Sequence, residues 1–310
     1  MKTRARTIIY RAATWVAVLV LFVVLLVLAN TFTEGERFHG LGTAGVIAIT
    51  LAGLLALFRA TRGSGAWEVS VRGIGWMTLG AVLHTASTYL FGVIVDASVG
   101  QVRVRPTICI PVLFGYAFGP VVGFFTGAVG SVLGDFISGW GVFPTWAMGS
   151  GLTGLVPGLV VLVAKERRNL RVLTTVVLVL IALTAGVVFI HPRAPEPWTD
   201  QVKNHSFWGW ALLVGGLVMM ANRFLLQDRS VALAAVNLWG TLGIMTGNAF
   251  AALADIWISE FTPGTAIIGA FAPAATTDLL NLMVFTPLVL AAYNLLRRTL
   301  GEKEVHGQDT

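Results

Sequence analysis

The chain has 310 residues, of which 56% are hydrophobic and only 12% are charged, and its mean hydropathy is +0.80. Soluble globular domains carry roughly 25% charged residues, so this composition excludes a water-soluble fold. The single cysteine, Cys109, excludes a disulfide framework and a cysteine-based zinc or iron–sulfur site. The net charge of +6 comes from Lys and Arg at the ends of apolar segments, which favours a lipid bilayer over nucleic acid as the partner.

Ten apolar stretches are candidates for membrane-spanning helices. A helix needs about 20 mostly apolar residues to cross a hydrocarbon core about 30 Å thick. We therefore predict an all-α integral membrane protein with about ten transmembrane helices. The predicted helices lie at 9–30, 41–58, 73–95, 106–118, 120–138, 145–164, 172–190, 207–225, 231–257 and 266–295.

Two boundaries in this series need a separate argument. The first stretch follows basic residues, as a signal-peptide core does, but it is too long for one and lacks a clear cleavage site, so we expect a retained helix. Gly119 and Pro120 separate the fourth helix from the fifth. Because proline is tolerated in the first turn of a helix and glycine allows a sharp turn, we expect these two helices to meet with almost no loop.

The distribution of positive charge predicts the orientation of the chain, because Lys and Arg resist translocation. With the N-terminus inside and ten crossings, 16 of the 21 Lys and Arg residues lie on the cytoplasmic side. We therefore predict a multi-pass protein of the plasma membrane with both termini in the cytoplasm. Residues 96–105, 139–144 and 258–265 are then extracellular, and 165–171 are cytoplasmic.

The segment from Arg103 to Gly158 concentrates glycine, proline and the few charges. Gly123, Gly127, Gly130 and Gly134 follow i, i+4, i+7, i+11 spacing, which places them on one helical face and allows a neighbouring backbone to approach closely. Together with Gly119 they are the predicted helix-packing glycines.

Asp135 adjoins this glycine face at the outer end of its helix. A carboxylate at mid-membrane costs about 2.5–3.5 kcal/mol on insertion scales, and less near the interface, so it usually marks a function or a buried partner. The structural alternative is that Asp135 caps the next turn or pairs with Arg103 or Arg105.

The same segment resembles the substrate-binding S components of energy-coupling factor (ECF) transporters. The likeness covers about 56 residues and rests on a short helix, a glycine-proline turn, a glycine-rich helix that ends in an acidic residue, and a small-residue helix after it. The residues that carry it are Arg105-Pro106, Pro111, Gly115, Gly119-Pro120, Gly123, Gly127, Gly134-Asp135, Phe143-Pro144, Gly151, Gly154 and Pro157-Gly158.

The resemblance implies a six-helix S-component-like core with two N-terminal and two inserted helices added to it. The expected parts are an N-terminal two-helix extension (1–71), four core helices (72–164), an inserted two-helix segment (165–230), the last two core helices (231–297) and a cytoplasmic tail (298–310). It also implies two kinds of partner, a transmembrane coupling subunit and two ATPase subunits. The family's docking motif on the first core helix has its nearest equivalents here at Gly73, Met77, Ala81 and Thr85, or at Gly80 followed by His84.

Polar residues placed by depth predict a pocket open to the outside. Ionisable residues inside a membrane normally face a bundle interior or a cavity, and most of those here lie from mid-depth to the outer face. In such a pocket Trp140, Trp146 and Trp257 would stack on a flat heterocycle while carboxylates and amides hold its edges. The candidate substrate-binding residues are His84, Arg105, Asp135, Trp140, Trp146, Asn248, Asp255, Asp278 and Asn281. Interfacial anchoring of the tryptophans and an interhelical hydrogen bond for His84 are the structural alternatives.

Motifs for catalysis are absent from the sequence. There is no G-x-x-x-x-G-K-[ST] phosphate loop, no H-E-x-x-H and no G-x-S-x-G, so we expect no enzyme activity, no metal and no cofactor in this chain, with ATP used by separate subunits. The leading hypothesis is a binding subunit that captures a small, water-soluble, vitamin-like nutrient. A stand-alone ion-coupled secondary transporter, with Asp135, Asp255 or Asp278 carrying protons or sodium, and a membrane-embedded enzyme are the alternatives.

The orientation is testable by cysteine accessibility in intact cells. With Cys109 replaced by serine as the background, Arg168→Cys is expected to resist a membrane-impermeant maleimide until the cells are opened, because 165–171 is predicted to be cytoplasmic. Pro263→Cys, in the predicted extracellular segment 258–265, is the matched control that should label at once. Labelling of the Arg168→Cys variant from outside would contradict the topology.

Overall fold

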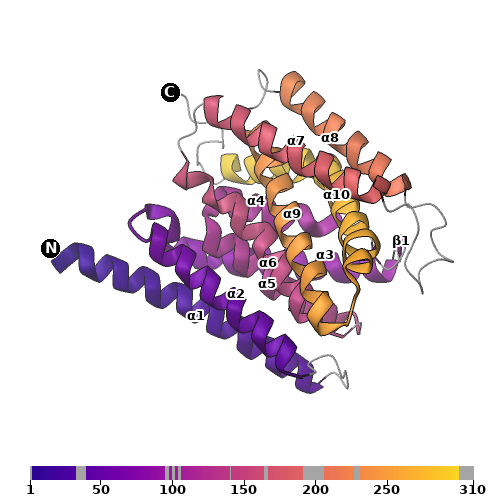
Figure 1. The fold of residues 1–310 in the computed structure, drawn as a ribbon. Helices are drawn as coiled ribbons and strands as arrows, with labels where there is room; N and C mark the ends of the chain where they lie inside the picture. Colours follow the sequence, from indigo (N-terminus) through magenta and orange to yellow (C-terminus); the bar gives the residue numbers. More distant parts are fainter. Residues whose placement is uncertain are drawn as a thin grey trace.

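The computed structural model describes residues 2–32, 40–94, 98–99, 102–103, 106–139, 141–163, 167–190, 206–226 and 231–299. Within these ranges the chain is helical apart from turns, short connections and one pair of two-residue antiparallel strands. All ten predicted helical segments are present (Figure 1), and α3, α5, α8 and α9 have both bounds within two residues of the prediction. The all-α fold class is confirmed.

The ten long helices follow one another along the chain, joined by short elements. The helices are α1 (Lys2–Phe32), α2 (Gly40–Thr61), α3 (Val71–Ile94), α4 (Cys109–Phe118), α5 (Pro120–Ile137), α6 (Pro144–Gly158), α7 (Arg167–Ile190), α8 (Ser206–Leu226), α9 (Val231–Ile258) and α10 (Ala272–Thr299). The short elements are the 3₁₀ turns η1 (Gly65–Trp67), η2 (Pro106–Ile108) and η3 (Leu159–Leu162), the strands β1 (Ser98–Val99) and β2 (Val102–Arg103), and the π-helix η5 (Thr265–Phe271).

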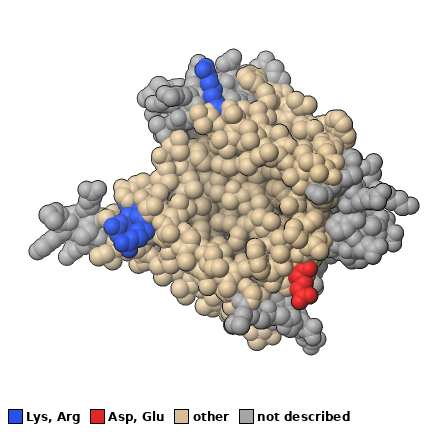
Figure 2. Space-filling model, in the orientation of Figure 1, with Lys and Arg blue, Asp and Glu red and all other residues tan. Residues whose placement is uncertain are grey.

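Among the described residues, seven helices are long and apolar enough to cross a membrane. α3, α4 and α8 do not meet both criteria, and the apolar segments 106–118 and 207–221 are shorter than the rest. Figure 2 shows a face whose charged side chains, where described, lie at its edges and leave the middle uncharged. An uncharged middle matches the hydrocarbon region of a bilayer, so the chain is a multi-pass membrane protein.

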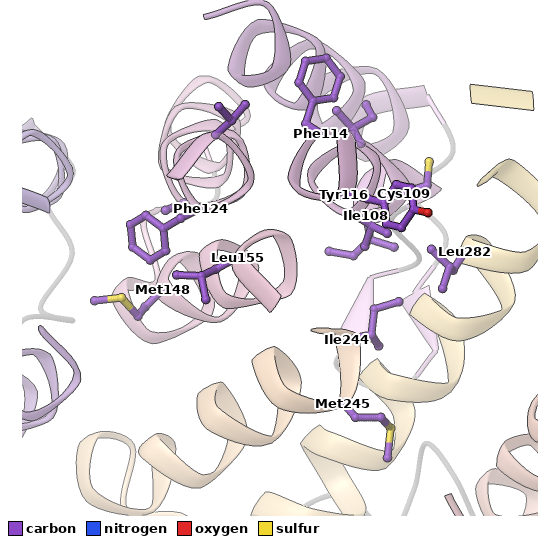
Figure 3. Close-up of a cluster of buried hydrophobic side chains, with 14 of the residues drawn as sticks. Ile108, Cys109, Phe114, Tyr116, Phe124, Met148, Leu155, Ile244, Met245 and Leu282 are labelled. Carbon is purple, nitrogen blue, oxygen red and sulfur yellow. The ribbon is translucent and has the colours of Figure 1, made fainter. Parts of the chain in front are cut away.

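The centre of the molecule is built from α4, α5, α6 and α9. α5 packs against α3, α4 and α6, while α6 also packs along α9, and α10 closes the bundle against α4 and α9. Buried side chains from these helices, including Phe124, Leu155, Ile244 and Leu282, fill the space between them (Figure 3). The core is therefore continuous across helices that are more than 100 residues apart in sequence.

Glycines let α5 and α6 approach until their backbones touch. A Cβ atom on Gly154 of α6 would lie 2.6 Å from the carbonyl carbon of Gly123, and one on Gly127 would lie 2.6 Å from the carbonyl carbon of Ser150. Real Cβ atoms do not come this close to a backbone. Small residues at such positions allow close contact between membrane helices, where dispersion forces and not the hydrophobic effect drive association.

The two pairs of additional helices flank opposite sides of this core in Figure 1. α1 packs on α5 and α2 on α9, while α7 and α8 pack on each other and against α9 and α10. An aromatic cluster fixes α1: the fully buried ring of Trp15 lies 5.2 Å from the ring of Trp67 and 5.3 Å from that of Phe124. The guanidinium of Arg11 forms an ion pair with Glu68 and donates a 2.7 Å hydrogen bond to the carbonyl of Ser64.

The contacts define two ends of the bundle. The basic end brings together Arg11, the 61–68 connection, the Gly119-Pro120 turn and the end of α6, because Gly119 abuts Ala66 and Gly158 abuts Pro120. The acidic end contains the start of α6 and the end of α9, where Thr145 donates a hydrogen bond to Asp255. Since α5, α9 and α10 run between these ends, a residue's position along its helix gives its depth.

The α5–α6 contact predicts which glycines tolerate a methyl group. Gly154→Ala is expected to destabilise the protein by about 1–3 kcal/mol, the usual effect of overpacking, because its methyl group meets backbone that cannot move aside. Gly53→Ala in α2 is the matched control, since nothing lies within 4 Å of a Cβ there, and alanine is the better helix former. Thermal unfolding in detergent would measure both, and equal melting temperatures would contradict the packing argument.

Candidate functional site

A buried carboxylate joins α6 to α9 at the acidic end. Asp255 is 7% exposed and accepts hydrogen bonds from Thr145 Oγ1 at 3.2 Å and from Trp146 Nε1 at 3.0 Å. Thr145 and Trp146 stand in the first turn of α6, directly after Pro144. The sequence prediction included Asp255 and Trp146 and missed Thr145, whose only signal was a polar residue beside a tryptophan at a helix start.

A second polar pair joins α9 to α10 at greater depth. Asn248 Nδ2 donates a 2.9 Å hydrogen bond to Asp278 Oδ2, and the two side chains are 7% and 9% exposed. Asn281 follows Asp278 by three residues and therefore lies one turn further along the same side of α10. Asn281 is 8% exposed and its Nδ2 has no hydrogen-bond partner in the structure.

Both pairs share one face of α9. Asn248 and Asp255 are seven residues apart, which is about two helical turns and roughly 10 Å along the axis. The residues Thr145, Trp146, Asn248, Asp255, Asp278 and Asn281 are referred to below as the polar cluster. It supplies two carboxylates, two amides, a hydroxyl and an indole N–H, a set suited to hydrogen-bonding the edges of a polar small molecule.

The electrostatic character of this region is acidic. Among the residues that the structure describes, Asp135, Asp255 and Asp278 are buried, while no Lys or Arg side chain is. The same residues contain no group of three or more His, Cys, Asp and Glu side chains able to hold a metal ion. Hydrogen-bond donors, rather than anions, therefore complement the interior.

His84 and Asp135 lie in a different part of the bundle. His84 is 3% exposed on α3, where its Nδ1 lies 3.3 Å from the carbonyl oxygen of Thr107 and its ring contacts Gly130. Asp135 is 1% exposed near the end of α5. Since α5 and α6 are antiparallel and Gly127 faces Ser150, Asp135 lies at the depth of the first turn of α6.

The glycine face of α5 serves two neighbours. Gly123 and Gly127 contact α6, whereas a Cβ on Gly130 would meet the His84 ring at 2.8 Å and one on Gly134 would meet Thr88 at 2.9 Å, both on α3. Gly119 precedes α5 with φ of +101°, in the region that favours glycine. The five predicted glycines from Gly119 to Gly134 therefore allow the close packing of the helices that carry the candidate side chains.

Two predicted site residues, Arg105 and Trp140, lie outside the described residues. Trp257 is described and 67% exposed, so its ring is not enclosed by the bundle. The predicted docking face of α3 is wrong for at least two of its positions, because Met77 and Ala81 are 6% and 4% exposed. These side chains face the interior, where a separate subunit does not reach them.

Comparisons with known proteins identify the class. A family model described as "ECF-type riboflavin transporter, S component" matches residues 68–226, which is 159 of the 310 residues. A UPF0397 protein of Vibrio atlanticus (strain LGP32) is 38% identical over 92 residues, 29% of this chain and 49% of the relative. A UPF0397 protein of Aliivibrio fischeri (strain MJ11) is 33% identical over 101 residues, 32% of this chain and 54% of the relative.

The chain thus spans about half the length of the curated relatives it matches. No solved structure matches it. The matching family is one of transporter components and not of enzymes. The chain belongs to the family of ECF-type riboflavin transporter S components.

Proposed function

We propose that this chain captures a small, water-soluble, vitamin-like nutrient at its acidic end, facing outside the cell. It then delivers that nutrient to a transmembrane coupling subunit and two ATPase subunits in the plasma membrane. The observation that carries the proposal is the polar cluster on α9, where Asn248 and Asp255 meet polar side chains of α6 and α10. Burying such groups in a membrane bundle is costly without a function or a partner.

Riboflavin is the first ligand to test, because the matching family model carries its name. Its ring system is flat and its edges both donate and accept hydrogen bonds, which suits the carboxylates and amides of the polar cluster. Trp146 lies beside Asp255, so its indole is available to report on a ligand there by fluorescence. Other neutral or cationic heterocycles fit the same acidic interior.

Variants of the polar cluster separate binding from folding. Asn248→Ala and Asp278→Asn are each expected to weaken riboflavin binding by about 1–3 kcal/mol, the effect of losing a buried hydrogen-bonding partner. The dissociation constant is measured by quenching of riboflavin fluorescence, with the melting temperature of the same samples. Thr246→Val, on an exposed position of α9, is the matched control. A lower melting temperature with unchanged affinity for both variants would remove α9 and α10 from the site.

Reconstitution in vesicles tests the transport role. The purified chain alone is expected to bind riboflavin without hydrolysing ATP, and addition of coupling and ATPase subunits is expected to give ATP-dependent uptake. Mass spectrometry of small molecules that co-purify with the chain shows whether another ligand is bound instead. Uptake driven by a proton or sodium gradient in vesicles that contain this chain alone would contradict the proposal and support a secondary transporter.

A further inference from the structure

Asn237 is a buried amide with no visible partner. It lies on α9 in the half of the bundle near the basic end, three turns from Asn248 and away from the polar cluster. Only 2% of its surface is exposed, and neither its Nδ2 nor its Oδ1 has a hydrogen-bond partner in the structure. Leaving a buried donor or acceptor unsatisfied costs about 1–3 kcal/mol. A buried amide whose donor and acceptor both lack a protein partner therefore indicates a bound group that supplies the hydrogen bonds.

Thr286 on α10 has the same property. It is 0% exposed and its Oγ1 has no partner. Other buried threonines of these two helices donate to the carbonyl four residues earlier, as Thr241 does to Asn237 and Thr276 does to Ala272, each at 2.7 Å. The hydroxyl of Thr286 makes no such bond, so it is available to a group outside its own helix.

The register of the helix pair brings Asn237 and Thr286 to the same level. α9 and α10 are antiparallel: Asn248 bonds Asp278, and, nearer the basic end, a Cβ on Gly240 would lie 3.0 Å from Leu282. One further turn along each helix leads from Gly240 to Asn237 and from Leu282 to Thr286. Asn237 also shares the face of α9 that carries Asn248, since eleven residues make about three turns.

A proline stands at this point of α10. Pro287 lies inside the helix, directly after Thr286, and has no N–H to donate to the carbonyl of Met283. Prolines inside membrane helices are tolerated where side chains, neighbouring helices or ordered waters satisfy the freed backbone group. Asn237, Thr286 and the Met283 carbonyl thus supply donors and acceptors at one level of the helix pair.

We propose that Asn237 and Thr286 form a buried hydration site at the Pro287 break, which holds ordered water between α9 and α10. Water fits the chemistry because it donates and accepts, and a buried water usually makes about three hydrogen bonds to otherwise unsatisfied groups. The groups are neutral and include both donors and acceptors, which a water molecule satisfies together. The site is distinct from the polar cluster, whose α9 and α10 side chains keep 7–9% of their surface exposed, against 0–2% here.

The sign of a stability change tests this site. If water bridges the groups, Asn237→Leu and the isosteric Thr286→Val each remove one of its hydrogen-bonding partners. The melting temperature of the full chain in detergent then falls by about 2–5 °C. If the site is dry, both substitutions remove unsatisfied polar atoms and the melting temperature stays the same or rises, which would overturn the proposal. Thr246→Val, exposed on α9, controls for the change of residue type.

A double variant tests whether the two side chains share the water. The melting temperature of the double variant Asn237→Leu/Thr286→Val is expected to be no lower than that of the less stable single variant, because either substitution alone releases the bridging water. Additive losses would overturn a shared site. Where Asn237→Leu fails to fold, the sign for Thr286→Val alone decides between hydrated and dry.

Discussion

The architecture depends on the backbone contact between α5 and α6. Because Gly123 and Gly154 have no side chains, these helices touch directly, and the short α4 fits beside them through Gly115. Lipid offers no hydrophobic drive for helix association, so such close dispersion contact must supply the stability. The first turn of α6 is thereby placed against the end of α9, where Thr145 and Trp146 meet Asp255. A methyl group at the α5–α6 contact would therefore displace the polar cluster as well as separate these two helices.

The two N-terminal helices contact the core at opposite ends. α2 reaches the acidic end, where Gly42 abuts the backbone of Trp257. α1 is fastened at the basic end, where Arg11 pairs with Glu68 and the Trp15 ring packs against Trp67 and Phe124. These contacts lie at the opposite end from Asp255. α1 therefore supports α5 through the aromatic contact, while α2 packs on α9 near the acidic end.

Helix positions followed from the sequence because apolar runs bounded by charge or by Gly119-Pro120 are local features. The strand pair, the π-helix η5 and the hydrogen bond from Asn248 to Asp278 did not follow, since each depends on register between segments. Asp255 was identified from its depth alone, whereas its partner Thr145 required the α6–α9 contact. Met77 and Ala81 were assigned to a docking face from the family resemblance. The sequence spacing alone does not show that this side of α3 packs against its own bundle.

Family similarity and the polar cluster cover different parts of the chain. The matched region, residues 68–226, includes α3 to α8 and ends before α9 begins. Four of the six polar-cluster residues lie on α9 and α10. α9 packs against α4 and α6, and α10 packs against α4 and α9. Similarity therefore accounts for the scaffold that positions the first turn of α6. In the function we propose, the α9 and α10 side chains beyond the matched region contact the ligand. The ligand named by the family model is therefore a starting point, to be tested with variants of Asn248, Asp255, Asp278 and Asn281.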